Sequence, residues 1–293
     1  MARVDGHAAS RAAAPRSPCR TSGCITGSPG SKPSGCCEHS LRATALRCVG
    51  LTADRSVRSG SAADHLRGRL RAASTRCGTG PRWLWRHERT AMDLEPLACA
   101  LVELGYRVAV VEYRPCWDGG AWPTAVHDCR DSLRALASQG EHWEDAVLVG
   151  HSAGAHLLLS AVAGSGAASM LLLAPVAELE RAAALDVGKG AVAGFLAAHL
   201  ASGGGIADAT PRITARDVES VTVVAAGCDQ AVPAELTDHQ QLWLESQGVP
   251  ARLVQVAGAR HMHLVNPDRP AHRTVLRELA ELASRIPAPG GRR

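Results

Sequence analysis

Residues 147–159 read Val-Leu-Val-Gly-His-Ser-Ala-Gly-Ala-His-Leu-Leu-Leu, and this stretch decides the fold. A short apolar run precedes a Gly-x-Ser-x-Gly pentapeptide, and a segment with helical spacing follows it. This order predicts a strand that turns sharply into a helix with Ser152 at the apex. We expect glycine at 150 and 154 because larger side chains would collide in so tight a turn. The turn is a nucleophile elbow, in which the backbone N–H of Ala153 can help to stabilise an oxyanion near the positive end of the helix dipole.

Strands and helices alternate on both sides of the elbow. The apolar and β-branched patterns predict strands at 106–114, 145–150, 170–176, 221–226 and 251–256. Helical spacing predicts helices at 92–104, 125–136, 153–163, 234–246 and 271–285. Residues 178–202 are alanine-rich and amphipathic, which suggests a small cap over the site. This alternation predicts an α/β fold, with a mostly parallel sheet and helices on both faces.

Three residues that follow strands have the chemistry of a catalytic triad. Ser152, Asp229 and His261 each come just after a predicted strand, where ligands bind in a parallel sheet. Their order along the chain is the order of an α/β-hydrolase triad. A serine hydroxyl needs an imidazole to take its proton, and the imidazole needs a carboxylate to fix its tautomer. We therefore expect Ser152 as nucleophile, His261 as base and Asp229 as the orienting acid.

Other histidines and aromatic residues near the elbow have alternative interpretations. His263 lies two residues beyond His261 and could take its place in the same loop. His151 and His156 flank Ser152, and the sequence assigns neither a catalytic role. Trp117, Trp122 and Phe195 could line an acyl or aryl pocket or could simply belong to the packed interior.

The first 80 residues differ from the rest of the chain. They contain no Phe, Trp or Tyr, six of the ten cysteines, and 13 Lys and Arg against 4 Asp and Glu, a net charge of +9. Residues 81–293 carry the remaining 19 basic and 24 acidic residues, a net charge of −5. A basic segment without aromatic residues cannot bury enough apolar area to offset its ordering entropy, so we expect disorder at 1–80 and one domain at 81–293.

The composition of this segment argues against several functions. The spacings of Cys19, Cys24, Cys36 and Cys37 fit no familiar zinc pattern, so no metal site is expected. The arginines are scattered and lack interleaved aromatic residues, so no nucleic-acid binding is expected. No stretch is apolar for long enough to span a membrane, and no targeting segment is recognised, so the expected location is the cytoplasm. The oligomeric state leaves no trace in the sequence.

Several motifs together resemble the α/β-hydrolase esterases related to kynurenine formamidase and to the hormone-sensitive-lipase group. They are Glu112-Tyr113-Arg114, Trp122-Pro123 with Asp128, residues 150–157, Ala174-Pro175-Val176, Asp229 with Val232-Pro233, and His261. The resemblance runs from about residue 85 to the end of the chain. It implies a serine hydrolase of small carboxylic esters or aryl formamides that needs no cofactor. It also implies a structural role for Asp128.

One segment departs from these families. Members of these families carry a His-Gly-Gly-aromatic-Trp segment directly after an earlier strand of the sheet. The backbone N–H groups of that segment complete the oxyanion hole. Here residues 76–86 read Arg-Cys-Gly-Thr-Gly-Pro-Arg-Trp-Leu-Trp-Arg. The motif is absent, so the alternative function is that of a catalytically impaired hydrolase-fold protein.

The genetic code offers a specific explanation for this departure. Codons CCA CGG TGG CTT for residues 81–84, read one base later, give CAC GGT GGC TT. This shifted text encodes His-Gly-Gly and begins a Phe codon. In the shifted frame Cys77-Gly78 forces Val or Ala, and free codon choice for the other residues of 76–80 allows the strand Val-Val-Val-Leu-Val directly before His-Gly-Gly. Trp85-Arg86 then resume in register. We therefore hypothesise that residues upstream of about 85 are translated out of frame. The first strands of the domain would then be missing from the chain.

Overall fold

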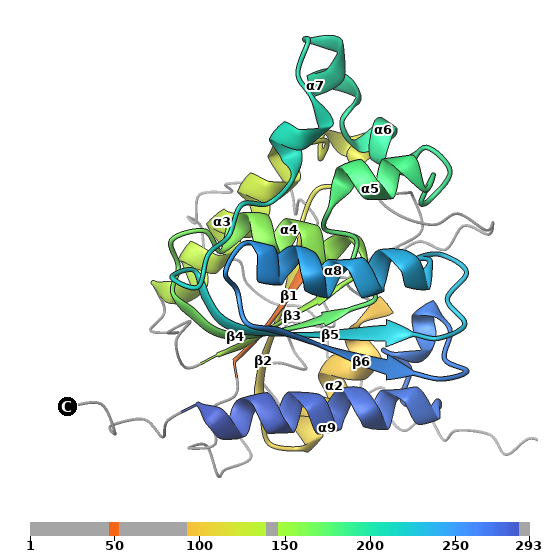
Figure 1. Ribbon diagram of the computed structural model, residues 1–293. Helices are drawn as coiled ribbons and strands as arrows, with labels where there is room; N and C mark the ends of the chain where they lie inside the picture. The colour runs from red at the N-terminus through yellow and green to blue at the C-terminus, as the bar shows by residue number, and fades with distance from the viewer. Residues whose placement is uncertain (1–46, 53–92, 139–145, 287–293) are drawn as a thin grey trace, which may run out of the picture. The chain divides into compact units, whose positions relative to one another are not determined.

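The computed structural model describes residues 47–52, 93–138 and 146–286 of the 293-residue chain, all within one compact unit, Ala43–Arg293. Within these residues a six-stranded sheet has the order β2-β1-β3-β4-β5-β6 (Figure 1). The strands are β1 Arg47–Thr52, β2 Arg107–Glu112, β3 Val147–His151, β4 Ala167–Leu173, β5 Val218–Ala226 and β6 Ala251–Val256. Strands β3 to β6 are parallel neighbours, whereas β1 runs antiparallel to both β2 and β3.

Strand β1 fills a gap in an otherwise parallel arrangement. Because β2 and β3 are both antiparallel to β1, they run parallel to each other, and helix α3 (Thr124–Ala137) connects them across the position of β1. A crossover that skips one position leaves room for one strand, and residues 47–52 occupy it. This strand belongs to the segment for which the sequence predicts disorder. The rest of residues 1–80 lies outside the described residues.

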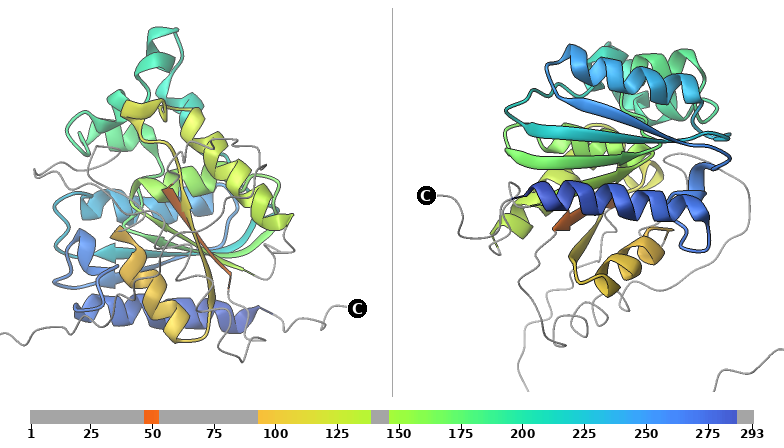
Figure 2. Two further views of the ribbon diagram at one scale, coloured as in Figure 1. Left: turned by 180° about the vertical axis from the view of Figure 1, so that it is seen from behind. Right: turned by 60° about the horizontal axis from the view of Figure 1, so that its bottom comes forward.

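Helices cover both faces of the sheet. Helices α3, α4 (Ala153–Ala161) and α8 (Ala234–Ser246) lie on one face, and α2 (Glu95–Glu103) and α9 (Pro270–Arg285) lie on the other (Figures 1 and 2). Two clusters of buried apolar side chains correspond to these two layers. The predicted fold class, a mostly parallel sheet between two helical layers, is confirmed.

The helix that follows the elbow lies in the interior of the fold. Leu157, Leu158 and Leu159 of α4 are all fully buried, and three consecutive helical residues point in three different directions, so this helix packs against the protein on several sides. It packs on β3 below and α3 beside it, and residues of the 178–202 segment belong to the same apolar cluster. Burying each of these leucines contributes about 1.5–3 kcal/mol, which fixes the helix and the turn at its start.

The predicted strands and helices between 92 and 285 occur with small shifts at their ends. Helix α8 and strand β6 match their predicted bounds, and β4 begins at Ala167 and ends at Leu173, earlier than predicted. Residues 178–202 form three short helices, α5 Leu179–Ala184, α6 Ala191–Phe195 and α7 Ala197–Ala201. Short 3-10 helices follow β2 (η3, Cys116–Asp118), α7 (η5, Ile206–Ala209) and β6 (η6, His261–His263).

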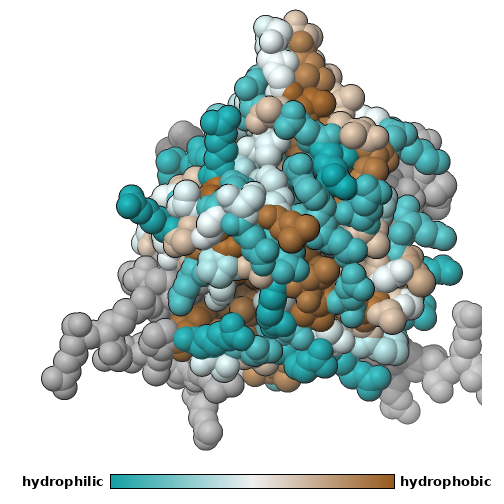
Figure 3. All heavy atoms as spheres, in the orientation of Figure 1, coloured by the Kyte–Doolittle hydropathy of each residue, from teal (hydrophilic) through white to brown (hydrophobic). Residues whose placement is uncertain are grey.

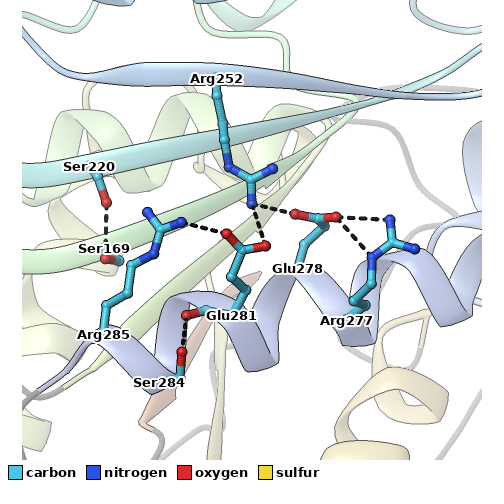
Figure 4. A network of polar contacts seen from close by, with 8 residues as sticks. All are labelled: Ser169, Ser220, Arg252, Arg277, Glu278, Glu281, Ser284 and Arg285. Atoms are coloured by element: carbon cyan, nitrogen blue, oxygen red, sulfur yellow. Dashed lines mark hydrogen bonds and ion pairs between the residues drawn. The ribbon is translucent and has the colours of Figure 1, made fainter.

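Polar contacts tie α9 to the underside of β6. Glu278 is 3% exposed and contacts both Arg252 of β6 and Arg277 of its own helix (Figure 4). Glu281, one turn further, contacts Arg252 and Arg285. The outer face seen in Figure 3 is largely hydrophilic, with separate hydrophobic patches, and Leu242 of α8 is 61% exposed.

Candidate active site

Ser152 stands at a strained turn between β3 and α4. Its backbone has φ 54° and ψ −124°, a conformation that residues with a side chain rarely adopt. The turn is held from β4, because the N–H of Ser152 donates to Leu173 O at 2.9 Å and the N–H of Val176 donates to Ser152 O at 3.2 Å. Ser152 is 8% exposed. Strain kept in place by hydrogen bonds from a neighbouring strand is a property of functional sites.

The two glycines of the pentapeptide have different roles. A Cβ atom at position 150 would lie 2.7 Å from Ala155 Cα, which is far inside van der Waals contact, so only glycine fits there. A Cβ atom at position 154 would meet no described atom within 4 Å. The prediction that collision requires glycine is therefore confirmed at Gly150 and wrong at Gly154, because residue 154 is already inside the helix and away from the crossing of strand and helix.

Asp229 and His261 form a buried hydrogen-bonded pair. His261 Nδ1 donates to Asp229 Oδ2 at 2.7 Å, and the two side chains are 8% and 2% exposed, respectively. The other carboxylate oxygen of Asp229 accepts from the backbone N–H groups of Ala231 and Val232 at 2.8 and 2.9 Å. Both oxygens are thus fixed, and the bond at Nδ1 leaves Nε2 as the acceptor nitrogen of a neutral imidazole.

The His261 loop reaches back across the sheet to the elbow. His261 follows β6, three strands away from β3, yet its ring lies 4.6 Å from the ring of His151, centroid to centroid. His151 is the last residue of β3 and directly precedes Ser152. The loop is also tied to the Asp229 turn, because the N–H of Cys228 donates to Ala259 O at 2.7 Å. The tertiary structure thus brings the predicted nucleophile, acid and base to the carboxyl ends of the parallel strands.

The structure describes one of the two backbone segments that are expected to form the oxyanion hole. Ala153, expected to supply one N–H, is the first residue of α4 and is buried. The segment 76–86, where the second donor is expected, lies outside the described residues.

The structure places the alternative histidines differently from His261. His263 lies on η6 beside His261, and the carboxylate of Asp229 contacts His261. His156 of α4 is fully buried, and its Nε2 donates to Ala209 O at 2.7 Å. Burial lowers the pKa of His156 to about 4, and the bond to Ala209 only partly offsets this.

Of the three aromatic residues that could line a pocket, two pack against histidines. Phe195 is 1% exposed and meets the ring of His156 edge-on at 5.6 Å, which places it in the interior. Trp122 meets the ring of His199 at 4.4 Å. Trp117 is 54% exposed.

Asp128 lies in a polar contact that the sequence did not reveal. Its carboxylate accepts from the Nε and Nη2 atoms of Arg114 at 2.9 and 2.7 Å and from the backbone N–H of Arg114 at 3.0 Å. Burial raises the pKa of Asp128, but these hydrogen bonds lower it more, so the net shift is downward. The contact joins the end of β2 to α3, in keeping with the structural role that the resemblance implies.

Among the described residues, no group of three or more His, Cys, Asp or Glu side chains is placed to hold a metal ion. No helix in that part of the chain is long and apolar enough to cross a membrane.

A family model provides the decisive comparison. The model named BD-FAE matches residues 79–245, more than half of the chain and a span that includes Ser152 and Asp229. The chain belongs to the BD-FAE family.

Solved structures show the same fold at low sequence identity. A carboxylesterase, Cest-2923 from Lactobacillus plantarum, has a TM-score of 0.53 and 15% identity over 69% of this chain and 83% of its own. An esterase from Thermogutta terrifontis has a TM-score of 0.50 and 19% identity over 73% and 82%. An acetyl ester-xyloside bifunctional hydrolase from Caldicellulosiruptor lactoaceticus has a TM-score of 0.50 and 16% identity over 71% and 83%. No curated protein matched the chain. This BD-FAE member therefore has the α/β-hydrolase fold of these esterases.

Proposed function

We propose that this BD-FAE protein is a serine hydrolase that cleaves small carboxylic esters through an acyl-enzyme on Ser152. The observation that carries the proposal is the buried bond between Asp229 and His261, which lies against the strained elbow of Ser152. A carboxylate, an imidazole and a serine on a strained turn are the groups that acyl transfer requires. Each comes from a different strand end.

The proposed reaction proceeds in two steps. Nε2 of His261 takes the proton of Ser152 Oγ as the oxygen attacks the ester carbonyl, and the N–H of Ala153 donates to the developing oxyanion. The intermediate collapses, the alcohol leaves with the proton from His261, and the acyl group stays on Ser152. Water then attacks the acyl-enzyme with His261 again as base. Asp229 holds the imidazole in the required tautomer throughout.

The proposed substrates are short-chain esters, with aryl formamides as a second class. The carboxylesterase folds of the structural neighbours support esters, and the motif resemblance to kynurenine formamidase supports formamides. Both classes present a carbonyl to the same serine and need neither a metal nor a cofactor. We expect no nucleic-acid partner.

A fluorophosphonate probe tests the activated serine directly. We expect the protein to be labelled at Ser152, and Ser152→Ala to abolish both the labelling and the hydrolysis of a short-chain aryl ester. Ser160→Ala, on the same helix, serves as the matched control and should keep both. Labelling that persists in Ser152→Ala would refute the assignment. Comparing an aryl acetate with N-formylkynurenine then ranks the two substrate classes.

A second candidate is a hydrolase-fold protein with impaired catalysis. Two observations favour it: residues 76–86 lack His-Gly-Gly, and the position between β2 and β3 is filled by an antiparallel strand from residues 47–52. The family match also begins at residue 79, close to the proposed loss of frame. Losing one oxyanion donor costs on the order of 3 kcal/mol, about a hundredfold in rate. We expect a version with the frame restored at 76–85 to be much faster than the chain as written.

We also propose the division that the sequence predicts, with residues 81–293 forming the hydrolase domain and 178–202 a small cap, and we add that β1 (Arg47–Thr52) contributes one strand to the sheet of that domain. Helices α5, α6 and α7 support the cap assignment. Deleting residues 1–42, which lie outside the unit Ala43–Arg293, should leave probe labelling unchanged.

A further inference from the structure

His151, the residue before the nucleophile, contacts both the backbone and the ring of His261. Its Nε2 donates to His261 O in a long hydrogen bond of 3.4 Å, and the two rings lie 4.6 Å apart with a tilt of 42°. The carbonyl oxygen can only accept, so Nε2 of His151 carries the proton. One side chain thus holds the base residue at two points.

The His261 loop needs such a contact because of where it starts. It leaves β6, the edge strand, and must cross the ends of β5 and β4 to reach β3. Its bonds to Asp229 and to Cys228 hold it to the turn after β5. Those bonds fix the tautomer of His261 and its distance from β5. Neither bond reaches β3, which ends at His151, directly before Ser152.

We propose that His151 is a positioning residue of the hydrolase site, which holds the His261 loop against the nucleophile elbow. This inference rests on the proposed function and extends it, since the sequence assigned His151 no role. His151 is bonded to Ser152 through one peptide bond, so a displacement of the His151 ring is transmitted directly to the backbone of the elbow. The hydrogen bond fixes the distance between the His261 loop and the end of β3. The ring contact fixes the direction from which the His261 imidazole approaches Ser152.

Three substitutions separate the two contacts. His151→Gln keeps an N–H donor at a similar reach and removes the ring, His151→Phe keeps a flat ring and removes the donor, and His151→Ala removes both. We expect His151→Ala to lower kcat for an aryl acetate about tenfold with little change in KM, because misplacing a catalytic group slows chemistry without weakening substrate binding. We expect His151→Gln to recover most of that loss. His127→Gln, at an exposed histidine of α3, is the matched control and should match the parent protein.

Rates are expressed per active site titrated with the fluorophosphonate, so a loss of folded protein is not read as a loss of rate. A merely structural role predicts a lower melting temperature and an unchanged rate per titrated site. That outcome would overturn the proposal, as would failure of His151→Gln to exceed His151→Ala.

A second measurement does not depend on turnover. The Nδ1 proton of His261, shared with Asp229, should give a far-downfield proton resonance. We expect it to be sharp in the parent protein and in His151→Gln, and broadened in His151→Ala as the loop loosens. If the parent protein shows neither labelling nor turnover, the proposed function fails, and this resonance still decides whether His151 holds the loop. An identical resonance in His151→Ala would refute the positioning role.

Discussion

At the scale of the residue, the elbow separates a glycine that is required by contact from one that is not. We expect Gly150→Ala to destabilise the protein by about 1–3 kcal/mol, because its Cβ would lie 2.7 Å from Ala155 Cα and the strand would have to move. Gly154→Ala, inside the helix and without a described atom near its Cβ, should be neutral or stabilising by up to about 1 kcal/mol. Urea unfolding of the two variants checks this, and equal losses would contradict it.

Asp229, the proposed orienting acid, gives the other prediction at this scale. We expect Asp229→Asn to keep the fold, since the amide oxygen can still accept from Ala231 and Val232, but to lower kcat by about 10⁴ because the amide favours the wrong tautomer of His261. Steady-state kinetics with an aryl acetate, beside a melting curve, test it. A loss of less than about tenfold would show that Asp229 is not the orienting acid.

At the scale of the element, His156 joins helix α4 to two segments beyond it. It bonds to Ala209 at the end of η5 and packs on Phe195 of α6. Burial lowers its pKa from 6.5 to about 4, so the folded state binds the proton less well than the unfolded state does. Its contribution to stability is fully present above pH 6.5 and is lost as the pH falls towards 4, by about 3 kcal/mol.

The measurement is the free energy of unfolding between neutral pH and about pH 4 for the parent protein and for His156→Gln. The glutamine can donate to Ala209 O and does not titrate, so its curve should lack this part of the acid loss. Parallel curves for the two proteins would contradict the assignment.

Helix α9 is held to β6 by a buried carboxylate, which gives a second prediction at this scale. Burial raises the pKa of Glu278, but its bonds to Arg252 and Arg277 lower it more, so the net shift is downward. The stability that it contributes is present above its unfolded pKa and is lost as the pH falls through the lowered folded value. We expect Glu278→Gln to cost about 1–3 kcal/mol near neutral pH, whereas Glu281→Gln, at a 45% exposed side chain, should cost less than about 1 kcal/mol. Equal thermal shifts for the two variants would argue against this ranking.

At the scale of the whole molecule, the sheet has one position that the chain upstream of residue 93 must fill. In the structure residues 47–52 fill it in the antiparallel direction, between two strands that are parallel to each other. The frame hypothesis supplies a different strand, directly before His-Gly-Gly. We expect the genomic DNA across codons 70–90 to contain a one-base shift that opens this reading. If no such shift opens a strand followed by His-Gly-Gly, the hypothesis fails and the segment is a genuine extension.

The sequence by itself determined the strands and helices between residues 92 and 285, the parallel part of the sheet and the order of Ser152, Asp229 and His261 along the chain, but it did not predict β1. Each of these depends on a local pattern, such as apolar alternation, a Gly-x-Ser-x-Gly turn or a polar residue just after a strand, and local patterns are readable along a chain. Only the tertiary structure decided that Asp229 bonds to His261, that Arg114 holds Asp128, that Gly154 meets no described atom and that the His151 ring contacts the His261 ring. These contacts join residues up to 110 positions apart. Their physical origin is the twist and packing of the whole sheet, which no local pattern specifies.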